Sequence, residues 1–118
     1  MKTRIGFVSN SSSSSFIITN KTKRVLTLVD FVRENPQFIE YYIKQYREGD
    51  DNSGYTQKKL LESAEKTDIE FAPKEKKHCT FGDEDYTLIG CVFDYILRDG
   101  GSSKSFKWRL VECRGEKY

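Results

Sequence analysis

The sequence predicts an α+β fold in a single domain over residues 1–118, with a mostly antiparallel sheet packed against three or four helices. Short β-branched and aromatic runs lie at 16–19 and 105–113, while the stretches between them repeat apolar residues at helical spacing. A chain of 118 residues is the length of one domain, and eight Phe, seven Tyr and one Trp are enough to fill its core.

The N-terminal region contains five consecutive serines between apolar runs. We expect strands at 4–8 and 16–19, joined as a hairpin by a hydroxyl-rich loop. The serines are Ser11, Ser12, Ser13, Ser14 and Ser15. Backbone N–H groups and hydroxyls in such a loop can bind a phosphate or a carboxylate, or dock a partner. The alternative is a plain hairpin loop whose serines bond one another and solvent.

Three helices are expected in the middle of the chain. Thr27 has the side chain of an N-cap, and Asp30 three residues later completes a capping box. The pair Asn35 and Pro36 should end this first helix and start a second over 36–47, with Asn35 as its cap. Thr56 should cap a third helix that ends near Lys66.

The second helix is unusually aromatic. Phe38, Tyr41, Tyr42 and Tyr46 provide more aromatic surface than one core-facing side of a helix requires. Tyrosine is frequent at protein interfaces because it offers a large rigid area with a polar tip. Tyr41, Tyr42 and Tyr46 are therefore candidate partner-binding residues, and packing into the core is the alternative.

The C-terminal half should return to strands. Residues 69–72 and 78–81 are expected to pair around the turn at 73–77. Residues 87–97 fit either a strand or a helix; the acidic residues before them and Gly100 after them favour a buried helix.

The last strand, 105–113, should direct Phe106 and Trp108 into the core and Lys107 and Arg109 outward. We expect the core to include Trp108 with Phe31, Phe38, Val92, Phe93 and Ile96. The alternative for this basic and aromatic strand is that its rings stack on nucleic-acid bases.

No arrangement of residues predicts a catalytic centre, a cofactor or a metal site. The acids that come closest to a Mg²⁺ site are Asp83, Glu84, Asp85, Asp94 and Asp99, and the first three also suit a helix N-terminus. His78 and Cys79 are adjacent in an expected strand, so their side chains point to opposite faces and cannot form a dyad.

The net charge of +2 combines basic terminal segments with acidic middle segments. These blocks either neutralise one another in the fold or bring the two ends together as one basic face. The three cysteines are odd in number and form no CxxC pair, which suggests a reducing compartment, and no apolar run approaches the roughly 20 residues of a membrane span.

Residues 6–16, GFVSNSSSSSF, resemble the N-terminal signature of small uncharacterised proteins of large tailed bacteriophages and their Gram-positive hosts. Residues 26–36 and 93–109 resemble the same phage or prophage family. The resemblance implies a viral protein that works in the bacterial host cytoplasm or is packaged in the virion, and it implies no catalytic residue.

Together these features predict a non-enzymatic interaction protein that binds a host, defence or virion protein, in an unknown oligomeric state. One alternative is a nucleic-acid-binding accessory protein that uses the basic terminal segments. The other is a small metal-dependent phosphoryl-transfer enzyme that uses the acids.

Overall fold

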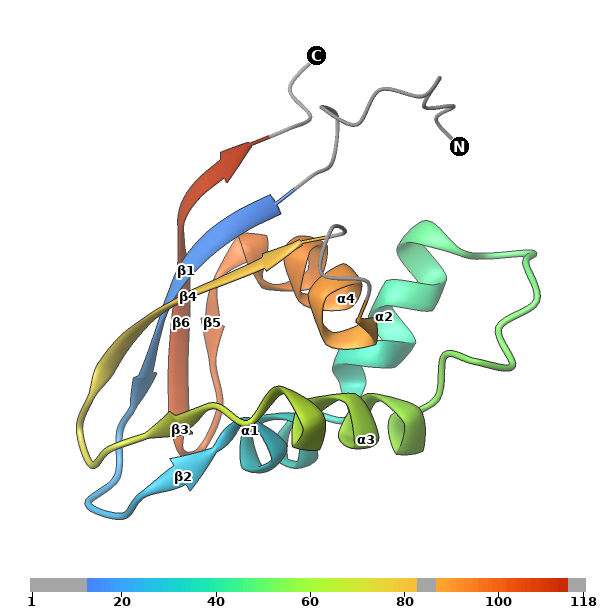
Figure 1. Ribbon diagram of the computed structural model, residues 1–118. Coiled ribbons are helices and arrows are strands. Elements are labelled where there is room, and N and C mark those ends of the chain that lie inside the picture. Colours follow the sequence, from blue (N-terminus) through green and yellow to red (C-terminus); the bar gives the residue numbers. More distant parts are fainter. Residues whose placement is uncertain (1–12, 83–86, 115–118) are drawn as a thin grey trace.

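The computed structural model describes residues 13–82 and 87–114. Helices and sheets share one hydrophobic core, so the expected α+β class is confirmed. Figure 1 shows the strands gathered on one side and the helices on the other.

The larger sheet of the described chain has four strands in the order β4-β1-β6-β5, and all neighbours are antiparallel. These strands are β1 (Ser13–Asn20), β4 (Lys76–Gly82), β5 (Gly101–Ser102) and β6 (Phe106–Arg114). A second sheet pairs β2 (Leu26–Thr27) with β3 (Glu70–Phe71). The first and last strands of the described chain, β1 and β6, therefore lie side by side.

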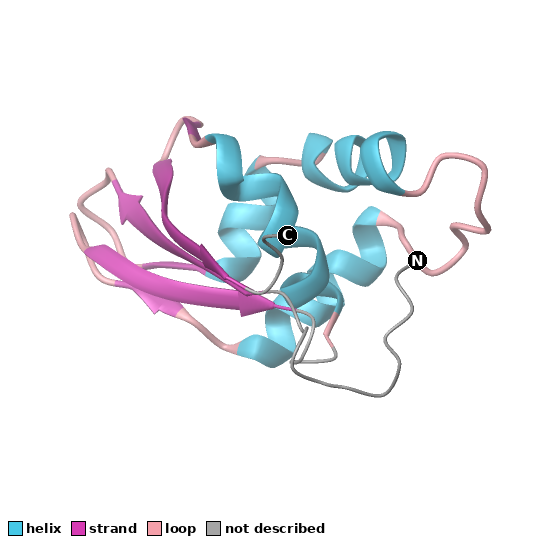
Figure 2. Ribbon diagram, turned by 90° about the horizontal axis from the view of Figure 1, so that it is seen from above, coloured by secondary structure: helices cyan, strands magenta, loops and turns pink. Residues whose placement is uncertain are grey.

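The helices cover one face of the larger sheet and leave its other face open, as Figure 2 shows. They are α1 (Leu28–Glu34), α2 (Gln37–Tyr46), α3 (Gln57–Thr67) and α4 (Leu88–Ile96), and α4 continues into a 3₁₀ turn at Leu97–Asp99. The expected helix over 87–97 is thus confirmed, and it packs against β4.

Phe31 of α1 lies at the centre of the core. Its ring contacts the rings of Phe38, Phe93, Phe106 and Trp108 edge to face, at centroid distances between 4.9 and 5.5 Å. All six residues expected in the core are buried. Aromatic rings from α1, α2, α4 and β6 therefore connect the helices to the sheet.

Threonines begin three of the helices. The Thr27 hydroxyl accepts from the Asp30 N–H at 3.3 Å, and the Asp30 carboxylate accepts from the Thr27 N–H at 2.9 Å, which confirms the capping box. Thr56 caps α3 as expected. Asn35 is different: it ends α1, and its side chain donates to the Phe31 carbonyl instead of capping α2.

Two expectations about the strands are wrong. Residues 13–15 belong to β1 instead of a loop, because β4 and β6 pair with them on both sides. Strands β3 and β4 do not form a hairpin, since β3 pairs with β2 and β4 with β1. The expected strand at 4–8, Ser11, Ser12 and the acids at 83–85 lie outside the described residues.

Candidate functional site

Four tyrosine rings meet where α2, α4 and the α2–α3 connection come together. We call Tyr42, Tyr46, Tyr55 and Tyr95 the tyrosine cluster. Tyr42 is its centre, with ring centroids 5.4 Å from Tyr46, 5.9 Å from Tyr55 and 6.4 Å from Tyr95. Tyr46 and Tyr95 are 4.9 Å apart. Each ring packs against at least one other ring, so the folded protein already holds these aromatic side chains in place.

Two guanidinium groups stack on this cluster. The Arg47 carbon Cζ lies 4.0 Å from the centroid of the Tyr55 ring, and the Arg98 Cζ lies 4.5 Å from that of Tyr95. Both distances are within the range of cation–π attraction. The surface therefore combines tyrosine and arginine, two of the three residue types most frequent at the energetic centres of protein interfaces.

Arg47 also orders the connection that carries Tyr55. Its Nε donates to Asn52 Oδ1 at 2.8 Å and its Nη2 donates to the Asp51 carbonyl at 3.0 Å. The Asn52 side chain donates back to the Arg47 carbonyl at 3.3 Å, and the Tyr55 N–H donates to the Asn52 carbonyl at 2.9 Å. These bonds fix the polar connection against the end of α2.

Arg98 is fixed from below by a buried carboxylate. Its Nη2 lies 3.0 Å from Asp94 Oδ1, and its Nε donates to the Asp94 carbonyl at 2.7 Å. The Ser14 hydroxyl donates to the same Oδ1 at 2.7 Å. A buried carboxylate needs such partners to offset the cost of desolvation. Ser14 therefore has a structural role beneath the cluster and is itself buried.

The cluster is only partly accessible. Tyr46 is 50% exposed, whereas Tyr42 is 8% exposed. Burial raises the pKa of Tyr42, and the neighbouring Cys91, Tyr55 and Tyr95 act in the same direction, so its hydroxyl remains neutral. Tyr41 is 46% exposed on the same helix but is not among the rings in contact here. Tyr55 and Tyr95 are half-buried, so Tyr46 is the most accessible ring of the cluster.

The structure separates the predicted partner-binding residues. Tyr42 and Tyr46 come together, whereas Tyr41 is exposed on α2 and is not among the rings in contact. Ser13 and Ser15 are half-buried in β1, where the Ser15 and Thr80 hydroxyls lie 3.1 Å apart. The described part of the serine tract is therefore strand surface and core.

Tyr55, Tyr95, Arg47 and Arg98 were missed by sequence reasoning, which singled out the aromatic residues of one helix. Arg98 follows Asp94 by four residues, a spacing that predicts an ion pair on a helix. That spacing could have predicted that the Arg98 side chain lies against Asp94. The meeting of Tyr55 and Tyr95 with Tyr42 depends on tertiary packing and has no local sequence signal.

The other candidate chemistries find little support in the described residues. Within 13–82 and 87–112, no group of three or more His, Cys, Asp or Glu side chains is placed to bind a metal. His78 is exposed and Cys79 is buried, on opposite faces of β4, and burial raises the pKa of the Cys79 thiol to about 11. Phe106 and Trp108 face the core, which confirms the expected packing and excludes the alternative that these rings stack on bases.

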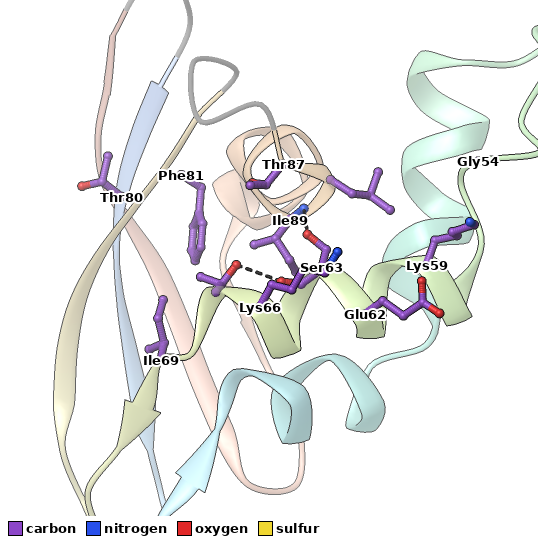
Figure 3. A pocket seen from close by; sticks show the side chains of 12 residues that line it. Gly54, Lys59, Glu62, Ser63, Lys66, Ile69, Thr80, Phe81, Thr87 and Ile89 are labelled. Atoms are coloured by element: carbon purple, nitrogen blue, oxygen red, sulfur yellow. Dashed lines mark hydrogen bonds between the residues drawn. The ribbon is translucent and has the colours of Figure 1, made fainter.

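A hollow of about 750 Å³ lies between α3, the end of β4 and the start of α4 (Figure 3). Its lining mixes Lys59, Lys66 and Glu62 with hydroxyls and the edge of Phe81. The Ser63 hydroxyl within it already accepts from the Ile89 N–H at 3.1 Å. Because both charge signs are present, the lining favours no particular ligand.

None of the helices in the described ranges is long and apolar enough to cross a membrane. Comparison of the chain with protein-family models, with curated proteins and with solved structures found no match in any of the three.

Proposed function

We propose that this protein works by binding another protein through the tyrosine cluster and its two stacked arginines. The observation that carries the proposal is the preformed contact of four tyrosine rings with two guanidinium groups at the junction of α2 and α4. Tyrosine and arginine supply a large contact area. Because folding already holds these side chains in place, less conformational entropy is lost when a partner binds.

Rigidity supports the same proposal. Arg47 is tied to Asn52 and Asp51, and Arg98 is tied to buried Asp94. A partner that contacts Tyr46 and the edge of Tyr95 would therefore meet side chains that lose little freedom on association. In keeping with the resemblance of residues 6–16, the partner we propose is a host, defence or virion protein of an infected bacterium.

The proposal is tested by capturing partners from infected bacterial lysate and then titrating the purified partner by calorimetry. Tyr46→Ala should weaken its binding by about 30-fold or more, the cost of losing an energetic centre of roughly 2 kcal/mol. Tyr41→Ala, outside the ring contacts, should weaken it by less than about fivefold, as expected at an interface rim.

Val111→Ala is the matched control, because Val111 is 45% exposed on β6, away from α2 and α4. The melting temperature of each variant shows whether it is folded. The proposal fails if Tyr46→Ala and Val111→Ala bind the partner as tightly as the unaltered protein, or if no protein is retained by the unaltered chain.

A further inference from the structure

A second surface lies at the end of the larger sheet where three connections meet: β1 to β2, β3 to β4, and β5 to β6. Within residues 19–25, 72–78 and 103–109 there are nine basic side chains and one acidic side chain, Glu75. We call the nine the basic end: Lys21, Lys23, Arg24, Lys74, Lys76, Lys77, Lys104, Lys107 and Arg109. The remaining residues of the chain carry 11 basic and 17 acidic side chains, so positive charge is concentrated here.

Backbone hydrogen bonds bring the three connections together. The Lys21 N–H donates to the Ser105 carbonyl at 2.8 Å, and the Lys74 N–H donates to the Thr22 carbonyl at 3.0 Å. Lys74 Nζ donates to the Lys21 carbonyl at 2.7 Å. Of the two outcomes considered for the charged blocks, the alternative that brings basic segments of both terminal regions together is supported by the bond between Lys21 and Ser105, and the segment around Lys74 joins them.

Asn20 fixes the shape of this end. It is fully buried, and its Nδ2 donates to the carbonyls of Arg24, Phe71 and Ala72 at 2.7 to 3.1 Å. Its Oδ1 accepts from the N–H and the hydroxyl of Thr22 at 2.8 and 2.7 Å. One buried amide thus orders two of the three connections, so the cations project from a defined scaffold.

The charge continues onto the open face of the sheet. In the strand register, Thr19 lies between Lys76 and Lys107, and in the next row Ile17 lies between His78 and Arg109. Of these residues, all but His78 line a hollow of about 260 Å³. Among the described residues, no helix covers this face (Figure 2), and along β6 the two cations are two residues, or about 7 Å, apart.

Most of these charges are not neutralised by the described protein. Lys77 pairs with Glu75 at 3.6 Å, and it is the one member of the basic end with an ion pair to an acid of the described chain. Glu34 of α1 faces Lys104, but its carboxylate already accepts from the Ser103 hydroxyl and the Ser105 N–H. An exposed surface with so much unpaired charge of one sign attracts a polyanion.

We infer that the basic end binds the phosphate backbone of double-stranded nucleic acid, largely without regard to sequence. Seven of its nine members are lysine, which is depleted in protein interfaces, whereas interfaces with DNA are strongly positive. Single strands are usually held by stacking bases on aromatic rings, and the rings of the adjoining strand, Phe106 and Trp108, face the core. With base stacking excluded, the exposed cations can bind backbone phosphates, which a duplex presents along both strands.

The test uses the full chain and a fluorescent DNA duplex of random sequence, about 20 base pairs long, titrated at several salt concentrations between about 50 and 200 mM. Binding should weaken steeply with salt. Replacing Lys76, Lys107 and Arg109 with Gln should reduce the slope of log K against log salt by about 2.7, since each phosphate contact contributes about 0.9. At the lowest salt the same variant should bind at least tenfold more weakly.

A matched control removes three cations from α2 and α3: Lys44, Lys58 and Lys66, each replaced by Gln. It changes the net charge equally and should leave the slope nearly unchanged. Equal weakening by both variants would overturn the proposal, because net charge alone would then explain binding. The proposal also fails if the duplex does not bind at low salt, if the single strand binds more tightly, or if polyglutamate or anionic vesicles bind in its place. Circular dichroism confirms that both variants are folded.

Discussion

Phe31 is the residue whose removal should damage this fold most. It is fully buried and contacts four other rings, with Phe106 at 4.9 Å and Trp108 at 5.3 Å as the nearest. Truncating a buried Phe to Ala costs about 3–5 kcal/mol, and each edge-to-face ring pair adds about 0.5–1.5 kcal/mol beyond area burial. Because these terms are not additive, we expect Phe31→Ala to lower the free energy of unfolding by about 5 kcal/mol.

The expected loss is comparable with the total stability of a small domain, about 5–15 kcal/mol. Phe31→Leu keeps most of the volume and should cost only about 1.5 kcal/mol. Urea unfolding followed by tryptophan fluorescence measures both, because Trp108 is the single tryptophan and packs on Phe31. Val111→Ala, on the open face of β6, should stay within about 0.5 kcal/mol of the unaltered protein.

The core assignment would be refuted by a loss below about 1 kcal/mol for Phe31→Ala. It would also be refuted if Phe31→Ala and Val111→Ala had equal effects. If Phe31→Leu proved as costly as Phe31→Ala, the ring geometry would outweigh the filled volume.

Two further changes test the ends of α1. Thr27→Ala removes the hydroxyl of the capping box and should cost about 1 kcal/mol in urea unfolding, whereas Thr27→Ser should retain most of it; equal losses would contradict the cap. At Glu34, burial alone would raise the pKa, but hydrogen bonds from Ser103 and Ser105 lower it below its ordinary value of 4.5. The carboxylate therefore stabilises the fold above about pH 4.5, and this contribution is lost as the pH falls through the lowered pKa. Unfolding measured at several pH values should show Glu34→Gln less stable than the unaltered protein at pH 7, with the difference shrinking as the pH falls below 4.5; a constant difference would contradict this.

Local chemistry predicted the helices well. The caps at Thr27 and Thr56 depend on residues three positions apart, so the information is contained in one turn of chain. The segment 88–96 was correctly expected to be helical and buried despite its β-branched content, because its termini and length outweighed propensity. The alternation of Phe106 and Trp108 with Lys107 and Arg109 likewise gave the two faces of β6.

Strand pairing was the part that sequence reasoning could not supply. The serines at 13–15 have loop composition, yet they continue β1 because residues 65 to 101 positions away, in β4 and β6, pair with them. Composition describes a residue's own preference, whereas a central strand is stabilised by partners on both sides. The same limit applies to the tyrosine cluster, since only packing of α4 against α2 brings Tyr95 to Tyr46.

The two proposed surfaces lie at opposite ends of the molecule. In Figure 1 the β1–β2 and β3–β4 connections are at the lower left, and the α2–α3 connection is at the far right. Figure 2 shows the same separation from above. Changes at sites that share no partners act nearly independently, so loss of Tyr46 should not alter duplex binding, nor loss of Lys107 the binding of a protein partner. Each proposal can therefore fail alone, and if both hold, one small domain would bring a protein partner to nucleic acid.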